Sequence, residues 1–197
     1  SGQPLNVWYL GIFEGIDKAT GQSIYKEGDP SAFKYYVGSP NPTMLLGLST
    51  DFSYKRFTAT INMNGTFGHY IFNNTAATAL GIGNLGGGRN IAKSILNTNA
   101  KEATSNAAAP STRYLEKGNY MKMANATLSY NVGNIGKAFR NMNISLTGQN
   151  LFVITKYSGF DPEVSTDGSV DGIPSLGIDY IPYPSARTVI LGVNFSL

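Results

Sequence analysis

Acidic and aromatic side chains gather between residues 156 and 185, in the part of the sequence best equipped for chemistry. Paired carboxylates can bind Ca²⁺ or catalyse glycoside hydrolysis, and aromatic rings among them can pack on a sugar ring or on a protein partner. The D-x-D-x-D-G spacing that is typical of a calcium-binding loop does not occur. The acidic residues are Asp161, Glu163, Asp167, Asp171 and Asp179, and the aromatic residues are Tyr157, Phe160, Tyr180 and Tyr183.

Three interpretations of this segment are open. An enzyme of the glycosidase kind would use Asp161 and Glu163 as its carboxylate pair. An ordinary surface loop would use its acidic residues only for polarity and local caps. We expect no enzyme activity, and we predict a surface that contacts a substrate or a partner, made of Tyr157, Phe160, Asp161, Glu163, Asp179, Tyr180 and Tyr183.

Other candidate motifs are weak. The chain has no Cys and a single His, which excludes a thiolate metal site and a multi-histidine site. We expect His69, close to a strand end, to be a surface or rim residue. Residues 81–86 (GIGNLG) match G-x-G-x-x-G, but a dinucleotide site needs a strand before the motif and a helix after it. The Gly-rich surroundings predict a flexible outer loop instead.

The composition narrows the class of protein. Charged residues make up 14% of the 197 residues, against roughly 25% in an average soluble domain. The mean hydropathy is −0.12, and no run approaches the ~18 apolar residues of a membrane-spanning helix, so a helical membrane protein is excluded. The aromatic content of 12% argues against disorder. The net charge of +3, without a Lys/Arg cluster, gives no sign of nucleic-acid binding.

Apolar and polar residues alternate with a period of two along much of the chain, which predicts half-buried β-strands. The polar positions carry Asn, Thr and Ser, and the predicted strands contain only Asp51, Lys122 and Arg187 as charged residues. A slip in the alternation at Gln149 and Asn150 predicts a β-bulge or a change of face. The predicted strands are 44–54, 57–67, 120–132, 142–154 and 186–197, with a less regular strand at about 5–13.

Short and long connections alternate between these strands. Residues 55–56 and 133–140 are the shorter ones, whereas 73–119 and 156–185 are long. A bilayer is crossed by tilted strands of about 9–11 residues, and only a closed ladder satisfies every backbone group in lipid. Long strands with uncharged polar faces and uneven loops therefore predict an all-β, antiparallel transmembrane β-barrel with long extracellular loops.

The alternative is a secreted β-sandwich that acts as an adhesin or glycan-binding module. It predicts a soluble monomer in which Val189, Leu191 and Val193 are buried in a core. Its outward faces would normally carry Lys, Glu and Arg, whereas the polar faces here carry Asn, Thr and Ser, which suit a wet lumen.

Residues 118–197 carry a series of short motifs that resemble one family, the SusC/RagA-type TonB-dependent outer-membrane transporters of Bacteroidetes. The GQNLF and KYSGFDPEV stretches, at this spacing, are the most specific of them. The matching stretches are 118–123 (GNYMKM), 128–130 (LSY), 148–152 (GQNLF), 156–164 (KYSGFDPEV), 177–180 (GIDY), 183–184 (YP), 187–188 (RT) and 192–195 (GVNF). Upstream, 2–4 (GQP), 37–42 (VGSPNP) and 52–55 (FSYK) resemble the family too.

The resemblance implies the C-terminal portion of a 22-stranded barrel with an internal plug. Residues 1–197 would form that portion, and further polypeptide would supply the plug and the N-terminal strands. It also implies that the protein imports oligosaccharides or peptides across the outer membrane, driven by TonB. A SusD-like surface lipoprotein would cover the barrel, and no cofactor is expected. Val193, Phe195 and Leu197 resemble the C-terminal barrel-assembly signal, with the C-terminus in the periplasm. Family members often carry a calcium-like loop where this chain has 26–30 (KEGDP), so we assign no metal site.

Overall fold

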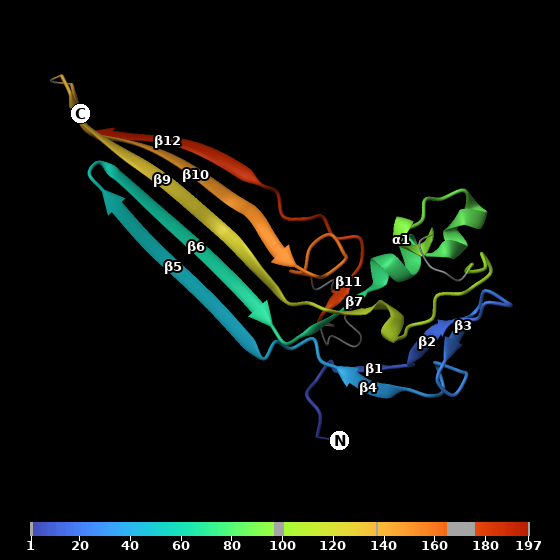
Figure 1. The fold of residues 1–197 in the computed structure, drawn as a ribbon. Coiled ribbons are helices and arrows are strands. Elements are labelled where there is room, and N and C mark those ends of the chain that lie inside the picture. The colour runs from blue at the N-terminus through green and yellow to red at the C-terminus, as the bar shows by residue number, and fades with distance from the viewer. Residues whose placement is uncertain (1, 97–100, 137, 165–175, 197) are drawn as a thin grey trace. The chain divides into compact units, whose positions relative to one another are not determined.

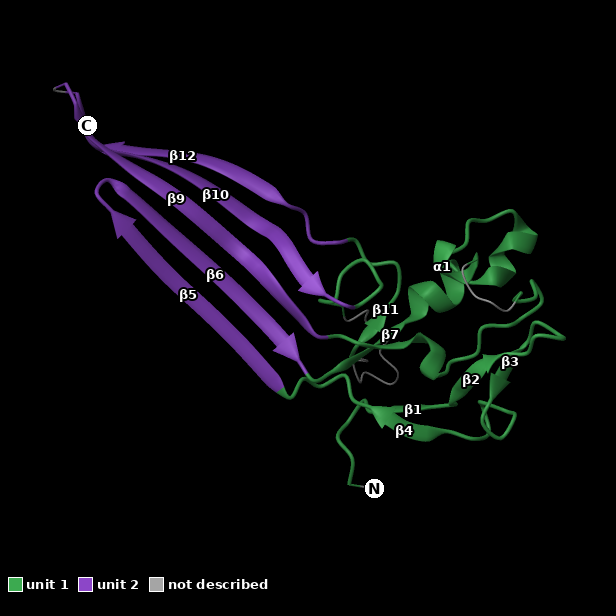
Figure 2. Cartoon of the chain, in the orientation of Figure 1, with its two compact units in different colours: residues 1–43, 68–118, 157–183 green, residues 44–67, 119–156, 184–197 purple. Residues whose placement is uncertain are grey.

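The computed structural model describes residues 2–96, 101–136, 138–164 and 176–196. Two compact units divide the chain (Figure 2). Unit 1 consists of residues 1–43, 68–118 and 157–183, and unit 2 of residues 44–67, 119–156 and 184–197. No helix among the described residues is both long and apolar enough to cross a membrane.

Unit 2 is a single antiparallel five-stranded sheet with the strand order β12-β10-β9-β6-β5 (Figure 1). The strands are β5 (Met44–Tyr54), β6 (Phe57–Phe67), β9 (Tyr120–Ile135), β10 (Phe139–Thr155) and β12 (Thr188–Ser196). The sequence alternation therefore predicted both ends of β5 and β6 correctly. At about 3.3 Å per residue, the 11 residues of each reach roughly 36 Å, enough to cross a ~25 Å apolar band at a tilt of about 45°.

The register of the sheet separates an apolar face from a polar face, on which Asp51 and Lys122 are charged and most other polar side chains are uncharged. Pairing across β5, β6, β9, β10 and β12 aligns Phe52, Ala59, Leu128, Leu146 and Leu191 in one row. The adjacent row on the opposite face consists of Ser53, Thr58, Ser129, Ser145 and Gly192. Hydrogen bonds link polar neighbours across strands, such as Asn62 Nδ2 to Asn125 Oδ1 at 2.8 Å and the hydroxyls of Thr127 and Thr147 at 2.9 Å.

The apolar face is uncovered within this sheet. Val189, Leu191 and Val193 are 69%, 71% and 47% exposed. The β-sandwich alternative required these three side chains to be buried between two sheets, and the structure contradicts that requirement. An exposed apolar face of this extent indicates contact with lipid or protein.

Aromatic side chains collect at the end of the sheet where the short turns lie. The rings of Phe57 and Tyr130 have centroids 4.7 Å apart, and those of Phe139 and Phe195 are 5.0 Å apart. The Lys55 ammonium lies 5.3 Å from the centroid of the Tyr54 ring. A belt of aromatic residues at one end of the strands is typical of a barrel at a membrane–water interface.

Two details of unit 2 refine the sequence prediction. The bulge is confirmed, because the β9–β10 register shifts between Gln149 and Phe152, and Asn150 adopts a left-handed φ of 52°. The connection predicted at 133–140 is shorter than expected, since β9 continues to Ile135 and β10 begins at Phe139. The Asn and Gly residues between 133 and 136 are typical of a turn. In the structure, hydrogen-bonded pairing between β9 and β10 nevertheless keeps residues 133–135 in the sheet.

Unit 1 combines the N-terminal segment, which forms β1 to β4, with the two long connections. Three small sheets have the orders β1-β4, β2-β3 and β11-β7-β8, and β11 runs parallel to β7. Its strands are β1 (Trp8–Leu10), β2 (Phe13–Ile16), β3 (Ser23–Tyr25), β4 (Tyr35–Gly38), β7 (Tyr70–Asn73), β8 (Leu115–Lys117) and β11 (Ile178–Asp179). Its helices are the π-helix η1 (Thr75–Ala79), the 3₁₀ helices η2 (Ile82–Gly87) and η3 (Thr112–Tyr114), and the short α1 (Lys93–Leu96).

A small hydrophobic core stabilises unit 1. Leu10, Phe72, Ala77 and Tyr114 are buried together, and the Trp8 ring lies 5.9 Å from that of Phe72. The predicted strand at 5–13 is replaced by β1 and the start of β2, because β1 pairs with β4 and β2 pairs with β3, while Gly11 between them makes only an isolated bridge to Ser111. A Cβ at Gly11 would lie 2.4 Å from Pro30 Cβ, so only glycine fits there.

The prediction for His69 was wrong. Its side chain is buried, with 7% exposure, and lies beneath the backbone of Gly118. The Gly118 amide donates to the His69 carbonyl at 3.0 Å, and a Cβ on Gly118 would lie 2.3 Å from His69 Nε2. Glycine opposite the ring makes room for it, and a single sequence does not reveal such a distant partner.

The structure also shows which element the 81–86 motif (GIGNLG) forms. Ile82–Gly87 forms the 3₁₀ helix η2 and follows a π-helix rather than a strand, so the dinucleotide interpretation is excluded. The predicted flexible outer loop contains this short 3₁₀ helix, η2.

Candidate functional site

The predicted contact residues separate into a buried group and an exposed group within unit 1. Asp179 is fully buried and Tyr157 is 5% exposed, so neither has surface with which to meet a substrate. Asp161 is also buried, whereas Phe160, Tyr180 and Tyr183 are 60%, 51% and 98% exposed. Glu163 is exposed, and its backbone amide donates to Asp161 Oδ1 at 2.9 Å. Asp167 and Asp171 lie outside the described residues.

The Asp179 carboxyl group is the centre of a buried hydrogen-bond network. The Tyr157 hydroxyl donates to Asp179 Oδ2 at 2.5 Å, and the Thr75 hydroxyl donates to Asp179 Oδ1. The Ile181 amide in turn donates to Thr75 Oγ1 at 2.7 Å. Burial, together with the bond to Asp179, holds the pKa of Tyr157 well above its ordinary value. The network therefore joins the two long connections, because Thr75 belongs to one and Tyr157 and Asp179 to the other.

A second polar cluster makes the same connection. The Ser158 hydroxyl and amide donate to Glu116 Oε1 at 2.6 Å and Oε2 at 2.8 Å. Asn73 Nδ2 donates to Glu116 Oε1 at 3.0 Å. Sequence reasoning missed Thr75, Asn73 and Glu116, because nothing in their local sequence distinguishes them from ordinary loop polarity.

A cavity of about 300 Å³ borders these networks. Phe160 lines it, so this predicted contact residue lies at a hollow rather than on a flat surface. The other lining residues are Asn73, Thr75, Ala76, Leu80, Ala92, Ser94, Ser158 and Gly159. The combination of an exposed ring with amide and hydroxyl groups suits a polar ligand group that also has an apolar side.

An ion pair stabilises another part of unit 1. Arg113 donates to Glu102 from both terminal guanidinium nitrogens, at 2.8 Å from Nη1 to Oε1 and 2.6 Å from Nη2 to Oε2. The side chains of Arg113 and Glu102 are 14% and 3% exposed. Asn106 Nδ2 also donates to Glu102 Oε1, at 2.6 Å. A bidentate, nearly buried pair of this kind fixes both partners in one geometry.

This ion pair predicts a loss of stability in acid. Burial opposes the charge on Glu102, but the bonds from Arg113 and Asn106 outweigh it and lower the pKa of Glu102 below its ordinary 4.5. A lowered carboxyl pKa contributes stability that is complete above 4.5 and declines as the pH falls through the lowered value. We expect limited proteolysis near residues 101–114 to accelerate severalfold as the pH falls well below 4.5. In Glu102→Gln, cleavage should already be fast at pH 7 and should change little as the pH falls. If the variant is cleaved slowly at pH 7 and accelerates in acid as much as the unaltered protein does, the prediction is contradicted.

The arrangement offers hydrogen bonding and aromatic contact. Among the described residues, no group of three or more His, Cys, Asp and Glu side chains is placed to hold a metal ion. Asp161 is buried, which does not support the open carboxylate pair that the glycosidase interpretation required.

A five-stranded sheet of long strands, apolar on one face and lined mostly by uncharged polar groups on the other, defines the wall of a transmembrane β-barrel. Comparison with known proteins shows which proteins the chain is similar to. The chain is 28% identical over 173 residues to TonB-dependent receptor P3 of Formosa agariphila, and 27% identical over 172 residues to TonB-dependent receptor SusC of Bacteroides thetaiotaomicron. Each match includes 83% of this chain. No family model matches the chain.

Solved structures give the same result for the fold. The RagAB peptide importer in its "open-open" state superposes with a TM-score of 0.79 and 23% identity over 100% of this chain. A second structure, of the RagAB peptide transporter, gives 0.79 and 21% over 96%. The chain spans 16–17% of the length of the two receptors and 22–23% of the solved chains. The resemblance to SusC/RagA-type TonB-dependent transporters that the motifs indicated is thus confirmed.

Proposed function

We propose that this chain forms part of the barrel wall of a TonB-dependent importer in a bacterial outer membrane. The uncovered apolar face of the five-stranded sheet is the observation that carries the proposal, because lipid is the environment that suits it. The likeness to TonB-dependent receptors and to a peptide importer supports import. Receptors and importers also fit the expectation that the chain is not an enzyme.

The edges of the sheet support a larger assembly. β5 and β12 each pair on one side only within the described residues. Unpaired backbone groups are not tolerated in lipid, so further polypeptide must pair with both edges. Residues 1–197 are then one portion of a barrel whose remaining strands and plug lie outside this sequence.

We assign unit 1 to the extracellular side and the short turns to the periplasm. This places the C-terminus in the periplasm and makes Val193 and Phe195, on β12, part of an assembly signal with Leu197, which lies outside the described residues. Phe160, Glu163, Tyr180 and Tyr183 are exposed on unit 1 and form the surface offered to substrate or to a SusD-like lipoprotein. Tyr157, Asp161 and Asp179 support this surface from within.

The cargo is an oligosaccharide or a peptide. Uncharged amides and hydroxyls on the polar face of unit 2 suit neutral, hydrogen-bonding cargo of either kind. The named relatives include a peptide importer and SusC, so both remain within the proposal.

Single-cysteine labelling tests the orientation, because the chain has no native Cys. Thr104→Cys, exposed on unit 1, should react with a membrane-impermeant maleimide on intact cells. Arg56→Cys, in the turn between β5 and β6, should react only after the outer membrane is permeabilised. The reverse pattern would overturn the orientation, and equal labelling of a protein found in the soluble fraction would favour the secreted module.

A further inference from the structure

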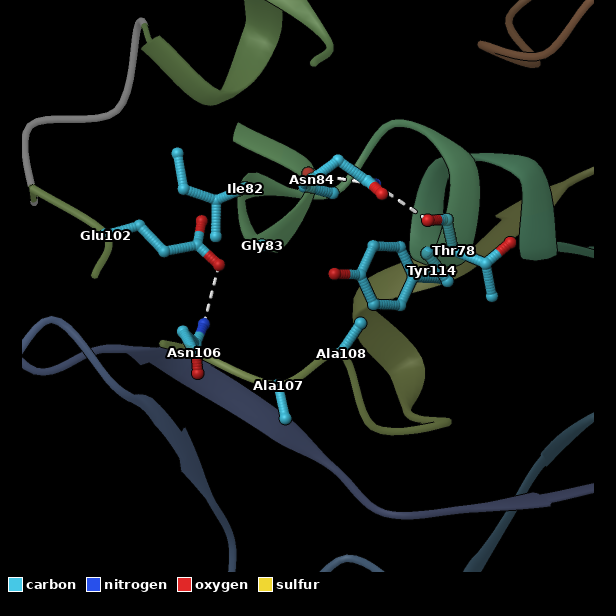
Figure 3. Close-up of a pocket in the computed structure, with 11 residues that line it drawn as sticks. Thr78, Ile82, Gly83, Asn84, Glu102, Asn106, Ala107, Ala108 and Tyr114 are labelled. Carbon is cyan, nitrogen blue, oxygen red and sulfur yellow. Dashed lines mark hydrogen bonds between the residues drawn. The ribbon is translucent and has the colours of Figure 1, made fainter. Parts of the chain in front are cut away.

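A second cavity, of about 190 Å³, lies inside unit 1 and is distinct from the exposed surface described above (Figure 3). Its volume is below the roughly 300–1,000 Å³ of sites for drug-sized ligands, so it suits one small molecule or the end group of a larger one. Its lining residues come mainly from η1, η2 and η3 and from the segment between Glu102 and Ala108.

The Tyr114 hydroxyl is directed into this cavity. Figure 3 shows its oxygen pointing to the space between Tyr114 and the Glu102–Asn106 pair. The residue is 9% exposed, and its ring packs in the core at 6.5 Å from the ring of Phe72. Within the described part of the chain, no protein group hydrogen-bonds this hydroxyl. Burial raises the pKa of Tyr114, so the group keeps its proton and is a donor at neutral pH.

Apart from Tyr114, the remaining hydrogen-bonding capacity of the lining side chains consists mainly of acceptors. Asn84 uses both amide hydrogens on the carbonyls of Thr78 and Gly81, at 2.8 and 3.2 Å, which leaves Oδ1 as a spare acceptor. Glu102 accepts three hydrogen bonds, whereas a carboxylate has about four acceptor sites. A ligand that fills the cavity must therefore donate to these acceptors and also accept from Tyr114.

Charge and shape narrow the ligand further. Arg113 neutralises Glu102, so the lining offers no net charge to attract an ammonium or a carboxylate. A carboxylate ligand could not donate to the spare acceptors at all. Ala77, Ile82, Ala107 and Ala108 add an apolar part to the wall, which suits C–H groups.

We propose that this cavity binds a small, neutral polyol, such as a single sugar ring, and that Tyr114 donates the central hydrogen bond to it. Hydroxyl groups both donate and accept, and the ring carbons of a polyol match the apolar wall. The proposal concerns recognition within unit 1 and does not depend on import through the barrel.

Saturation-transfer NMR on the intact barrel protein in detergent tests the proposal. The probes are D-glucose, myo-inositol and lactose, with acetamide, methylammonium and acetate as comparators. We expect saturable binding of at least one polyol, weakened about tenfold in Tyr114→Phe, because this variant removes the donor but keeps the ring. Lactose separates two kinds of site. A site that takes the terminal sugar of a longer saccharide should bind lactose, whereas a site for free monosaccharides only should not.

Two further variants keep the test decisive. Tyr36→Phe removes an exposed tyrosine hydroxyl of the same unit and should bind like the unaltered protein. Ala107→Leu narrows the cavity and should also abolish polyol binding. The proposal is overturned if no polyol binds, if methylammonium or acetate binds instead, or if Tyr114→Phe and Tyr36→Phe bind equally well. The labelling of Thr104→Cys reports orientation independently of all these outcomes.

Discussion

Replacing Asp179 by Ala should destabilise unit 1 by about 3–5 kcal/mol. The side chain is fully buried and accepts from both Tyr157 and Thr75, so its removal leaves two buried hydroxyls without their acceptor. Leaving a buried donor unsatisfied costs about 1–3 kcal/mol, and the lost volume adds a cavity cost. Because 1.4 kcal/mol corresponds to a factor of ten, amide exchange at 176–183 should accelerate by roughly 10²–10³-fold.

Hydrogen–deuterium exchange on the intact protein measures this effect. Asp179→Asn keeps one acceptor oxygen but turns an N–H toward the second hydroxyl, so we expect it to retain only part of the protection. Asp29→Asn, an exposed carboxylate of the same unit that accepts only from the nearby Ser31 amide, should leave exchange at 176–183 unchanged. Equal exchange in Asp179→Ala and Asp29→Asn would show that the network does not hold the two connections together.

The sequence alone predicted the strands of unit 2 well, for a physical reason. Each strand separates two unlike environments, so a strict period of two is imposed along its whole length. Met44–Tyr54 and Phe57–Phe67 show this most clearly, because every residue between their ends pairs with a neighbour in register. The bulge near Asn150 was also visible, since one extra residue reverses the alternation.

Unit 1 could not be predicted in the same way, because its contacts join residues that are far apart in sequence. Asp179 bonds to Thr75, 104 residues away, and β11 pairs in parallel with β7. An Asp in a polar loop is normally exposed, so its burial leaves no local signal. Pattern reasoning therefore found the residues around 156–185 but assigned Tyr157 and Asp179 to a contact surface instead of to the interior.

The candidate site shows the same limit. Nothing in the local sequence of Glu102 indicates that its partner is Arg113. Tyr114 lies in a short 3₁₀ helix whose sequence does not distinguish it from an ordinary core tyrosine. Only the packing of η2 and residues 102–108 around it creates a cavity and directs its hydroxyl into the space.

A single charge on the apolar face of unit 2 should separate the membrane interpretation from a soluble one. Leu128 lies near the middle of β9, is 50% exposed, and has Ala59 and Leu146 beside it on the neighbouring strands. In a bilayer, Leu128→Arg should cost about 2–4 kcal/mol, the effect of Arg at the midplane of a barrel. On a water-facing sheet, the same exposed substitution should stay within about 0.5 kcal/mol.

Ser129→Arg is the matched control, because the next residue of the same strand faces the polar side of the sheet. Urea unfolding of the intact protein in lipid vesicles should show the large loss only for Leu128→Arg, and less of this variant should reach the outer membrane in cells. The contrast depends on the period of two, since adjacent residues differ only in the face they occupy. If the two variants lose equal stability, lipid does not cover the apolar face; if Ser129→Arg alone is destabilised, the polar face is the one that is buried.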